Sequence, residues 1–158
     1  MELVMVLHGV SVVTTGLFAG LMMTLVFIMH KQWLAQSRAE YWVQFQGFLR
    51  VAKGNGLVTV LTLYSFLVPL ALSVHLLVQG AILRGALMGI AGLVFMLGCF
   101  VVTMALNFPI YNKVISWRSE ADAVGWEEIR RRFHLLNCIR FASSLCACAA
   151  LLVAALLR

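Results

Sequence analysis

One arginine stands inside an otherwise apolar segment of this sequence. Arg140 lies in the run 135–157, which contains no other Lys, Arg, Asp or Glu. A cation at mid-bilayer costs about 2.5–3.5 kcal/mol on the most lenient insertion scales, so it usually faces a bundle interior or a watery cavity. Unpaired amides in hydrocarbon are also costly. We therefore predict that Asn107, Asn112, Asn137 and Arg140 converge on one cavity in the inner leaflet.

Side chains near Arg140 suit proton transfer and aromatic stacking. His134 can act as a base or as a hydrogen-bond donor to an oxygen of a ligand. Trp117 and Trp126 can cover an aromatic ligand, although tryptophans beside a membrane span also form the ordinary interfacial belt. We predict that the bound molecule is hydrophobic and that Trp117, Trp126 and Asn137 contact it.

Two further histidines leave a metal or haem site open as an alternative. His8 and His75 both belong near the outer face, and neutral imidazole is a common ligand. No spacing motif supports this pair, so we predict no cofactor and keep haem or a metal as the alternative. Eight methionines, some of them beside His30, raise copper as a further alternative, although methionine is also an ordinary gap-filler.

The cysteines indicate neither a metal centre nor disulfides. All four, Cys99, Cys138, Cys146 and Cys148, lie in apolar segments, where cysteine most often behaves as a small hydrophobic residue. Residues 146 and 148 lie about 200° apart on a helix, so both thiols of one helix cannot chelate one ion.

Four apolar runs must position these residues, and each is long enough to cross a bilayer, which takes about 20 residues. They cover 3–29, 57–78, 86–106 and 135–157. Only 11% of the residues are charged, against roughly 25% in a soluble domain. The first run follows Glu2 and lacks the features of a cleaved signal. We predict one integral membrane domain over 1–158, an all-α bundle of four transmembrane helices.

Lys and Arg residues predict the orientation of the bundle. The loops around 30–56 and 107–134 carry nine of them, and the opposite side carries Arg84 and Arg158. By the positive-inside rule, both long loops are cytoplasmic and both termini are outside. The protein is then a multi-pass protein of the cell membrane, the inner membrane if the source is bacterial. This asymmetry accounts for the net charge of +6, so we predict no nucleic-acid partner.

Several local patterns predict how the spans begin, bend and pack. Gly16-x-x-x-Gly20 permits close approach of a neighbouring helix. The aromatic segment 39–50 reads as an amphipathic helix on the membrane surface, with Trp42, Phe45 and Leu49 on one face. Asn55 can cap the second span, Pro69 should bend it, and Pro109 should end the third. The last helix should open at Asp122 or Gly125, and the short segment 79–85 predicts a tight hairpin of spans two and three.

The second half of the sequence carries polar residues in a distinctive order: Asn107-x-Pro109-x-x-Asn112, Trp117, Trp126, Arg130-Arg131-Arg132-Phe133, Asn137 and Arg140. Together with the glycine-rich segment 16–20, this order resembles that of a family of small four-helix membrane proteins, which includes the anthrone oxygenase-like proteins of aromatic polyketide pathways. The family pattern has Trp where Phe133 stands and often His where Asn137 stands.

The resemblance implies oxidation of a flat, activated phenolic methylene to a quinone by dioxygen. In that chemistry Arg140, Asn107 and Asn112 stabilise the oxyanion, His134 takes the proton, and Trp117 and Trp126 stack on the ring. It implies no metal or nucleotide. Two other functions remain open: a non-catalytic membrane subunit whose polar cluster docks a partner chain, as a homo-oligomer or with another subunit, and a redox protein that holds haem or a metal at His8 and His75.

Overall fold

Four long helical columns form the molecule, so the prediction of an all-α bundle is confirmed. The computed structural model describes residues 2–157, and the described part contains no strand. Four helical stretches are long and apolar enough to cross a membrane: 2–34, 56–78, 82–115 and 126–156. The elements are α1 (Glu2–Met23), the π-helical η1 (Thr24–Met29), α2 (His30–Leu34), α3 (Arg38–Lys53), α4 (Gly56–Val78), α5 (Ile82–Phe95), the π-helical η2 (Met96–Val101) and η3 (Thr103–Asn107), α6 (Phe108–Ile115), the 3-10 turn η4 (Glu120–Asp122) and α7 (Trp126–Leu156).

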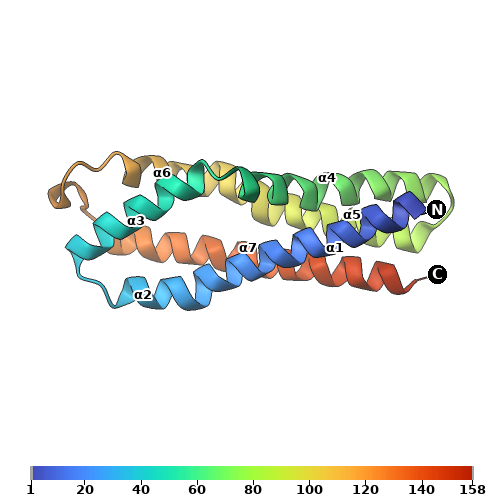
Figure 1. Ribbon diagram of the computed structural model, residues 1–158, viewed down its shortest axis with the longest axis horizontal. Helices are drawn as coiled ribbons and strands as arrows, with labels where there is room; N and C mark the ends of the chain where they lie inside the picture. Colours follow the sequence, from blue (N-terminus) through green and yellow to red (C-terminus); the bar gives the residue numbers. More distant parts are fainter. Residues whose placement is uncertain (1, 158) are drawn as a thin grey trace.

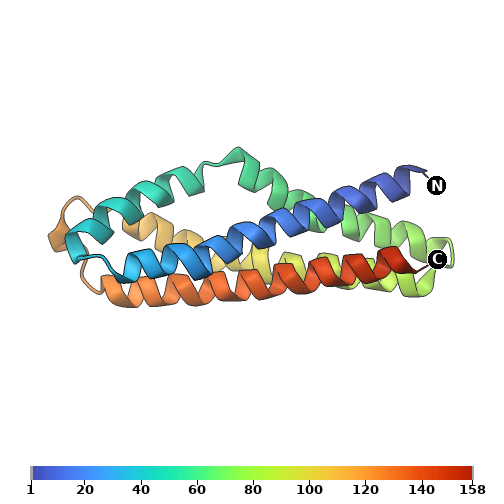
Figure 2. The same ribbon diagram turned by 60° about the horizontal axis from the view of Figure 1, so that its bottom comes forward.

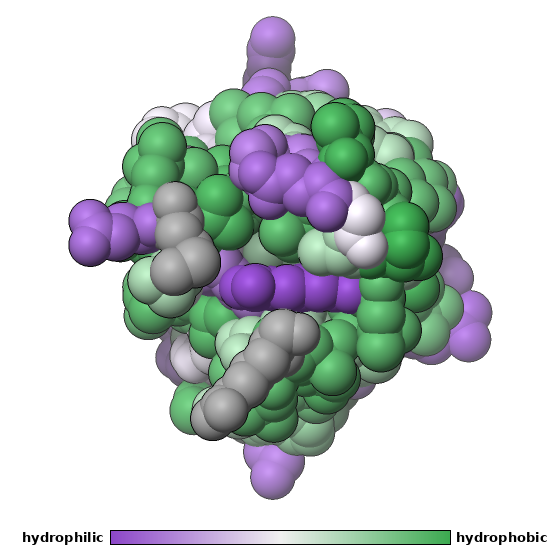
Figure 3. All heavy atoms as spheres, turned by 90° about the vertical axis from the view of Figure 1, so that its right-hand side faces the viewer, coloured by the Kyte–Doolittle hydropathy of each residue, from purple (hydrophilic) through white to green (hydrophobic). Residues whose placement is uncertain are grey.

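The columns run antiparallel along one axis (Figure 1). The start of α1, the end of α7 and the α4–α5 turn lie together at one end, here called the terminal end. The α2–α3 turn and the segment 116–125 lie at the opposite end, here called the loop end. Gly80 makes the α4–α5 turn with a φ of 80°, a conformation that glycine adopts without strain, and the predicted hairpin is confirmed. Figure 3 looks at the terminal end, where apolar side chains surround a hydrophilic centre.

Three of the columns are longer than a bilayer is thick. They have 33, 34 and 31 residues, or roughly 46–51 Å at 1.5 Å per residue. The hydrocarbon core is only about 30 Å thick, which the 23 residues of α4 already span. The loop end therefore projects beyond the hydrocarbon, and there α3 takes the place of α4 as the fourth column.

The α3 helix packs on the bundle itself, and it meets α4 at a bend (Figure 2). Its helical structure was predicted, but its buried face carries Tyr41, Phe45 and Leu49, each fully buried, while Trp42 is only half-buried. These residues cover α6 and its neighbours. The expectation of a helix lying on the membrane surface is therefore wrong, because α3's apolar face is buried in protein.

Caps and turn residues explain where the helices begin and end. Ser37 and Glu40 form a capping box that starts α3, and hydrogen bonds from Ser37 lower the pKa of the Glu40 carboxyl. Asn55 caps α4 by accepting from the Val58 N–H at 3.0 Å, as predicted. Gly125, with a φ of 72°, directly precedes α7. The prediction of a helix start at this glycine is therefore confirmed.

Pro109 does not end the third column, as was expected. The helix continues to Ile115, with Pro109 in the first turn of α6. The preceding residues 103–107 are π-helical, so the backbone has already changed its hydrogen-bond register before the proline. In a first turn the missing N–H of proline costs least. Pro69 likewise lies within an α4 that stays helical from Gly56 to Val78.

Close helix packing depends on glycines of the third column. A methyl group on Gly85, Gly89 or Gly92 would collide with side chains of α4, and one on Gly98 would collide with Ser143 of α7. The predicted close approach at Gly16 and Gly20 is wrong, because a Cβ at Gly20 meets no atom within 4 Å and one at Gly16 makes only ordinary contact. Small residues allow helices to approach where side-chain packing drives association.

Candidate functional site

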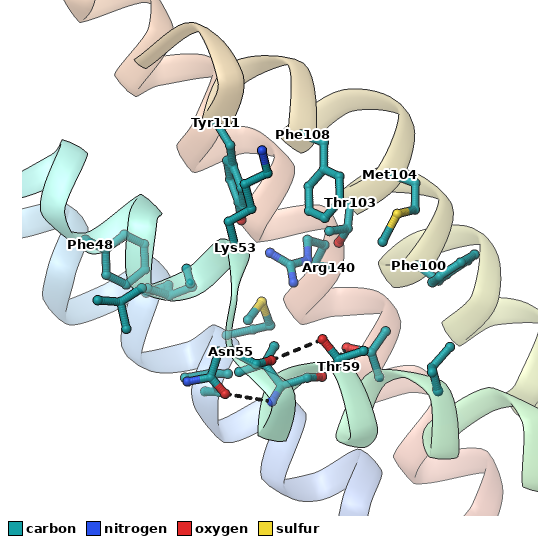
Figure 4. Close-up of a pocket in the computed structure, with 18 residues that line it drawn as sticks. Phe48, Lys53, Asn55, Thr59, Phe100, Thr103, Met104, Phe108, Tyr111 and Arg140 are labelled. Atoms are coloured by element: carbon teal, nitrogen blue, oxygen red, sulfur yellow. Dashed lines mark hydrogen bonds between the residues drawn. The ribbon is translucent and has the colours of Figure 1, made fainter. Parts of the chain in front are cut away.

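A cavity of about 210 Å³ opens where the fourth column is broken between α3 and α4 (Figure 4). This volume is many times what a single water molecule requires. Its wall comes from all four columns and is mostly apolar. The lining residues are Leu21, Met22, Leu25, Phe48, Val51, Ala52, Lys53, Asn55, Val58, Thr59, Thr62, Leu63, Phe100, Thr103, Met104, Phe108, Tyr111 and Arg140.

The cavity lies near the membrane boundary on the loop side. Its α4 residues extend only from Val58 to Leu63, the first two turns of a helix that spans the hydrocarbon. At 1.5 Å per residue these positions lie within roughly 10 Å of the start of α4. Lys53, Thr59 and Met104 line the cavity and are exposed, so it opens on the flank of the bundle.

The local backbone explains why a cavity forms at this depth. Gly54 and Asn55 interrupt the helix, and Asn55 then caps α4, so side chains of α3 and α4 diverge around the break. Opposite the break, Leu25, Phe100 and Thr103 lie in the three π-helical segments. A π-helical turn is rare, is often found at functional sites, and widens the helix where it occurs.

Arg140 is the buried polar centre of the cavity. Its side chain is 4% exposed, and its Nη1 donates to Asn137 Oδ1 at 2.9 Å. Its Nε has no hydrogen-bond partner among the described residues. The guanidinium lies 5.4 Å from the ring centre of Phe18, a cation–π distance. In Figure 4 Arg140 points into the cavity from α7, and its cation acts electrostatically on the hydroxyl of Tyr111.

The remaining polar groups of the cavity are neutral or lie at its mouth. Thr59, Thr62 and Thr103 donate their hydroxyl hydrogens to carbonyls of their own helices, so their oxygens are left as acceptors. Lys53 lies at the mouth, where its Nζ donates to Asn112 Oδ1 at 2.7 Å. No Asp or Glu lines the cavity, so its formal charge is positive.

The structure brings some of the predicted polar residues together. Asn137 and Arg140 are hydrogen-bonded, and Asn112 reaches the cavity mouth through Lys53 while its own side chain is exposed. Asn107 is fully buried, and neither its Oδ1 nor its Nδ2 has a partner among the described residues, yet it does not line the cavity. Asn137 supports the guanidinium rather than lining the wall.

His134 lies away from the cavity. Its ring stacks on that of His30, with ring centres 3.5 Å apart and planes 11° apart, on the seam of the first and last columns. Its Nε2 is 3.5 Å from Cys138 Sγ. His134 and Arg140 lie six residues apart on α7, so their side chains point about 120° away from each other. His134 therefore faces the first column while Arg140 faces the cavity.

Trp117 is buried in the hydrophobic core, and Trp126 packs against that core within an aromatic cluster at the loop end. Trp126 lies 5.0 Å from the Tyr41 ring, and the Arg130 guanidinium lies 4.6 Å from the Trp126 ring. Gln46, 9% exposed, donates to the Trp117 carbonyl at 2.8 Å and to two carbonyls at the end of α6. Burial raises the pKa of Tyr41 above its ordinary range. Neither tryptophan lines the cavity.

The terminal end does not join the two outer histidines. His8 is 3% exposed, donates from Nε2 to the Leu151 carbonyl at 2.8 Å, and has Arg84 Nη2 3.4 Å from its Nδ1. His75 is exposed. Among residues 2–157 no group of three His, Cys, Asp or Glu is arranged to hold a metal ion.

Sequence reasoning missed Lys53 and Tyr111 as cavity residues. Tyr111 lies one turn after Asn107, within a segment already identified as polar. Lys53 directly precedes Gly54-Asn55-Gly56, a helix-breaking segment that was used only to place a cap. A break in a helical column was the available indication that a cavity forms there.

Comparison with known protein families gives a match. The family model described as Anthrone oxygenase matches residues 45–151, about two thirds of the chain. The matched region extends from α3 to α7 and includes Lys53, Tyr111 and Arg140. No curated protein and no solved structure matches the chain.

Proposed function

Because this chain belongs to the anthrone oxygenase family, we propose that its cavity binds a flat, hydrophobic aromatic molecule of the anthrone or quinol type and promotes its oxidation by dioxygen. The observation that carries the proposal is the position of Arg140: a buried cation with an unpartnered Nε, facing an apolar cavity that opens near the membrane boundary. A hydrophobic substrate dissolved in the bilayer can enter such a cavity directly.

The proposed reaction converts a ring methylene to a carbonyl. Two C–H bonds of the methylene break, one oxygen atom of O₂ becomes the carbonyl oxygen, and the other leaves as water. The first step is loss of a proton, which places negative charge on the phenolic oxygen of the substrate. Arg140 stabilises that charge, with the Tyr111 hydroxyl as a second donor, because a fixed donor in a water-poor site acts strongly on charge that develops there.

The other candidate residues have roles that follow from their positions. Asn137 orients the guanidinium, and Asn112 holds Lys53 at the mouth, where water can accept the released proton. Asn107 supports the wall from a buried position next to the cavity-lining Phe108. His134 lies outside the cavity, so a proton reaches it only through water or movement of α7.

Oxygen uptake by the purified protein with an anthrone substrate tests the proposal. We expect catalysed uptake with one O₂ consumed per quinone formed, a loss of at least tenfold in Arg140→Gln, and a smaller loss in Tyr111→Phe. Cys146→Ser, at an exposed position, is the matched control and should keep full activity. Uptake that equals the uncatalysed rate in the wild type would refute the proposal. Co-purification of a partner lost in Arg140→Gln would favour a membrane subunit instead.

A further inference from the structure

The cavity contains a fixed positive charge for which the described residues supply no counter-ion. Arginine stays protonated in proteins, so Arg140 carries its charge at every physiological pH. Its side-chain partners are neutral: the guanidinium donates to the Asn137 amide oxygen and interacts with the Tyr111 hydroxyl. The carboxylates Glu2, Glu40, Asp122, Glu127 and Glu128 are all exposed, and none of them lines the cavity. The electrostatic partner of Arg140 is therefore absent from the described residues.

A second cation lies at the entrance with an equally neutral partner. Lys53 is exposed and donates to the amide oxygen of Asn112. Its flexible stem lets the ammonium group follow a ligand that enters or leaves. Two positive charges beside apolar walls raise the local concentration of anions and oppose the entry of cations.

The rest of the lining is suited to a hydrophobic body. Leu25, Leu63, Phe100 and Met104 contribute apolar side chains, and the threonine hydroxyls are already used within their helices. A neutral ligand would leave the Arg140 cation buried without charge compensation. A carboxylate would accept hydrogen bonds from the guanidinium fork, including the unpartnered Nε, and such bonds are roughly twice as strong as neutral ones.

We propose that the cavity binds a hydrophobic carboxylate, with its anionic group on Arg140, its passage controlled by Lys53, and its apolar body against Phe100 and Met104. This inference rests on the proposed function, whose substrate is then an aromatic acid with a carboxylate close to the phenolic oxygen, so that both oxygens share the guanidinium of Arg140. A fatty acid of the bilayer has the same chemistry. The experiment must therefore separate an aromatic acid from an acyl chain.

A fluorescence titration of the full chain in neutral detergent tests the proposal with anthracene-2-carboxylate and its uncharged partner, anthracene-2-carboxamide. We expect the acid to bind at least tenfold more tightly than the amide in the wild type. Arg140→Gln should abolish that preference. Affinity for the acid should fall as salt is added, and Lys53→Gln should make this fall smaller. Lys31→Gln, an exposed lysine outside the cavity lining, is the matched control and should change neither property.

Each result has a defined meaning. Equal binding of acid and amide by the wild type overturns the proposal without reference to any variant. An acid preference that persists in a folded Arg140→Gln protein overturns the assignment to Arg140. Displacement of the bound acid by palmitate, but not by palmityl alcohol, would support a carboxylate as the bound group and identify a fatty acid, rather than an aromatic acid, as the ligand. Failure of oxygen uptake with a retained acid preference refutes the proposed oxidation alone.

Discussion

Arg140 is 4% exposed, has an unpartnered Nε, and finds only neutral partners in Asn137 and Tyr111. A buried charge with so few partners is costly, and replacing such groups by apolar residues of similar volume is often neutral or stabilising. The native residue is therefore better explained by ligand binding than by packing. This conflict between stability and function is common at functional sites.

We predict that Arg140→Leu abolishes ligand binding and oxidation while the bundle stays folded. The free energy of unfolding should stay within about 1 kcal/mol of the wild type or rise by up to roughly 4 kcal/mol, because an uncompensated cation is removed. Thermal melting in detergent beside the binding titration checks both parts. A fall in melting temperature with full function retained would identify Arg140 as a structural residue.

At the scale of the elements, the site depends on interruptions in the helices. The α3–α4 break opens the cavity, and three π-helical segments contribute residues to the opposite wall. Contacts with neighbouring helices must fix the positions of these irregular segments. Two such contacts are the close approach of Gly98 to α7 and the anchoring of α6 by Gln46.

Gly98→Ala should destabilise the bundle by about 1–3 kcal/mol, because the new methyl group would overlap the Ser143 side chain of α7. Gly9→Ala is the matched change in a helix, since no atom lies within 4 Å of its Cβ position, and it should stabilise by up to about 1 kcal/mol. Melting temperatures of the two variants in one detergent provide the measurement. A Gly98→Ala protein as stable as Gly9→Ala would contradict the packing.

Gln46→Ala should lower stability by about 1–3 kcal/mol, because its buried amide donates to the carbonyls of Val114, Ile115 and Trp117 and so ties α3 to the end of α6. Gln44→Ala is the control on the same helix: its contact with Gln36 is exposed, so its effect should stay within about 0.5 kcal/mol. Denaturation curves of the two variants check the difference. Equal effects would show that the Gln46 bonds do not support the loop end.

At the scale of the whole molecule, the bundle is longer than the membrane and differs at its two ends. The loop end carries most of the positive charge and projects beyond the hydrocarbon, with the cavity at its base. A half-buried polar contact between His8 and Arg84 lies at the terminal end. This asymmetry suggests that ligand is exchanged on the loop side.

We predict that the loop end is cytoplasmic and that both termini are outside, because the two long loops carry nine Lys and Arg against two on the opposite side. Reporter domains fused after Arg118 and after Arg84 provide the measurement. A reporter after Arg118 should be active only inside the cell, and one after Arg84 only outside. The reverse pattern would place the cavity at the outer face and refute this orientation.

The amino-acid sequence alone determined the class of the protein. Four apolar runs allow little else than a helical membrane bundle, since helices satisfy their own backbone hydrogen bonds in lipid. Asn55 and Gly125 marked helix starts because capping is a local interaction. Arg140 was identified from the free-energy cost of placing a cation in hydrocarbon. Its hydrogen bond to Asn137 is also local, because the two residues lie within one turn of the same helix. The family resemblance, carried by residues 107–140, was also found at this level and is confirmed by the match over 45–151.

The tertiary structure decided which polar residues share the cavity. Whether Asn107 or Tyr111 faces Arg140 depends on the rotation of one helix against another and on the π-helical turns that shift it, and neither follows from spacing along the chain. His134 is on the same helix as Arg140, where a spacing of six residues already turns the two side chains about 120° apart. In the structure Tyr111 and Lys53 line the cavity, and His134 packs against His30 between the first and last columns. It also assigned α3 to the bundle, because an amphipathic face packs equally well on lipid or on protein until its neighbours are known.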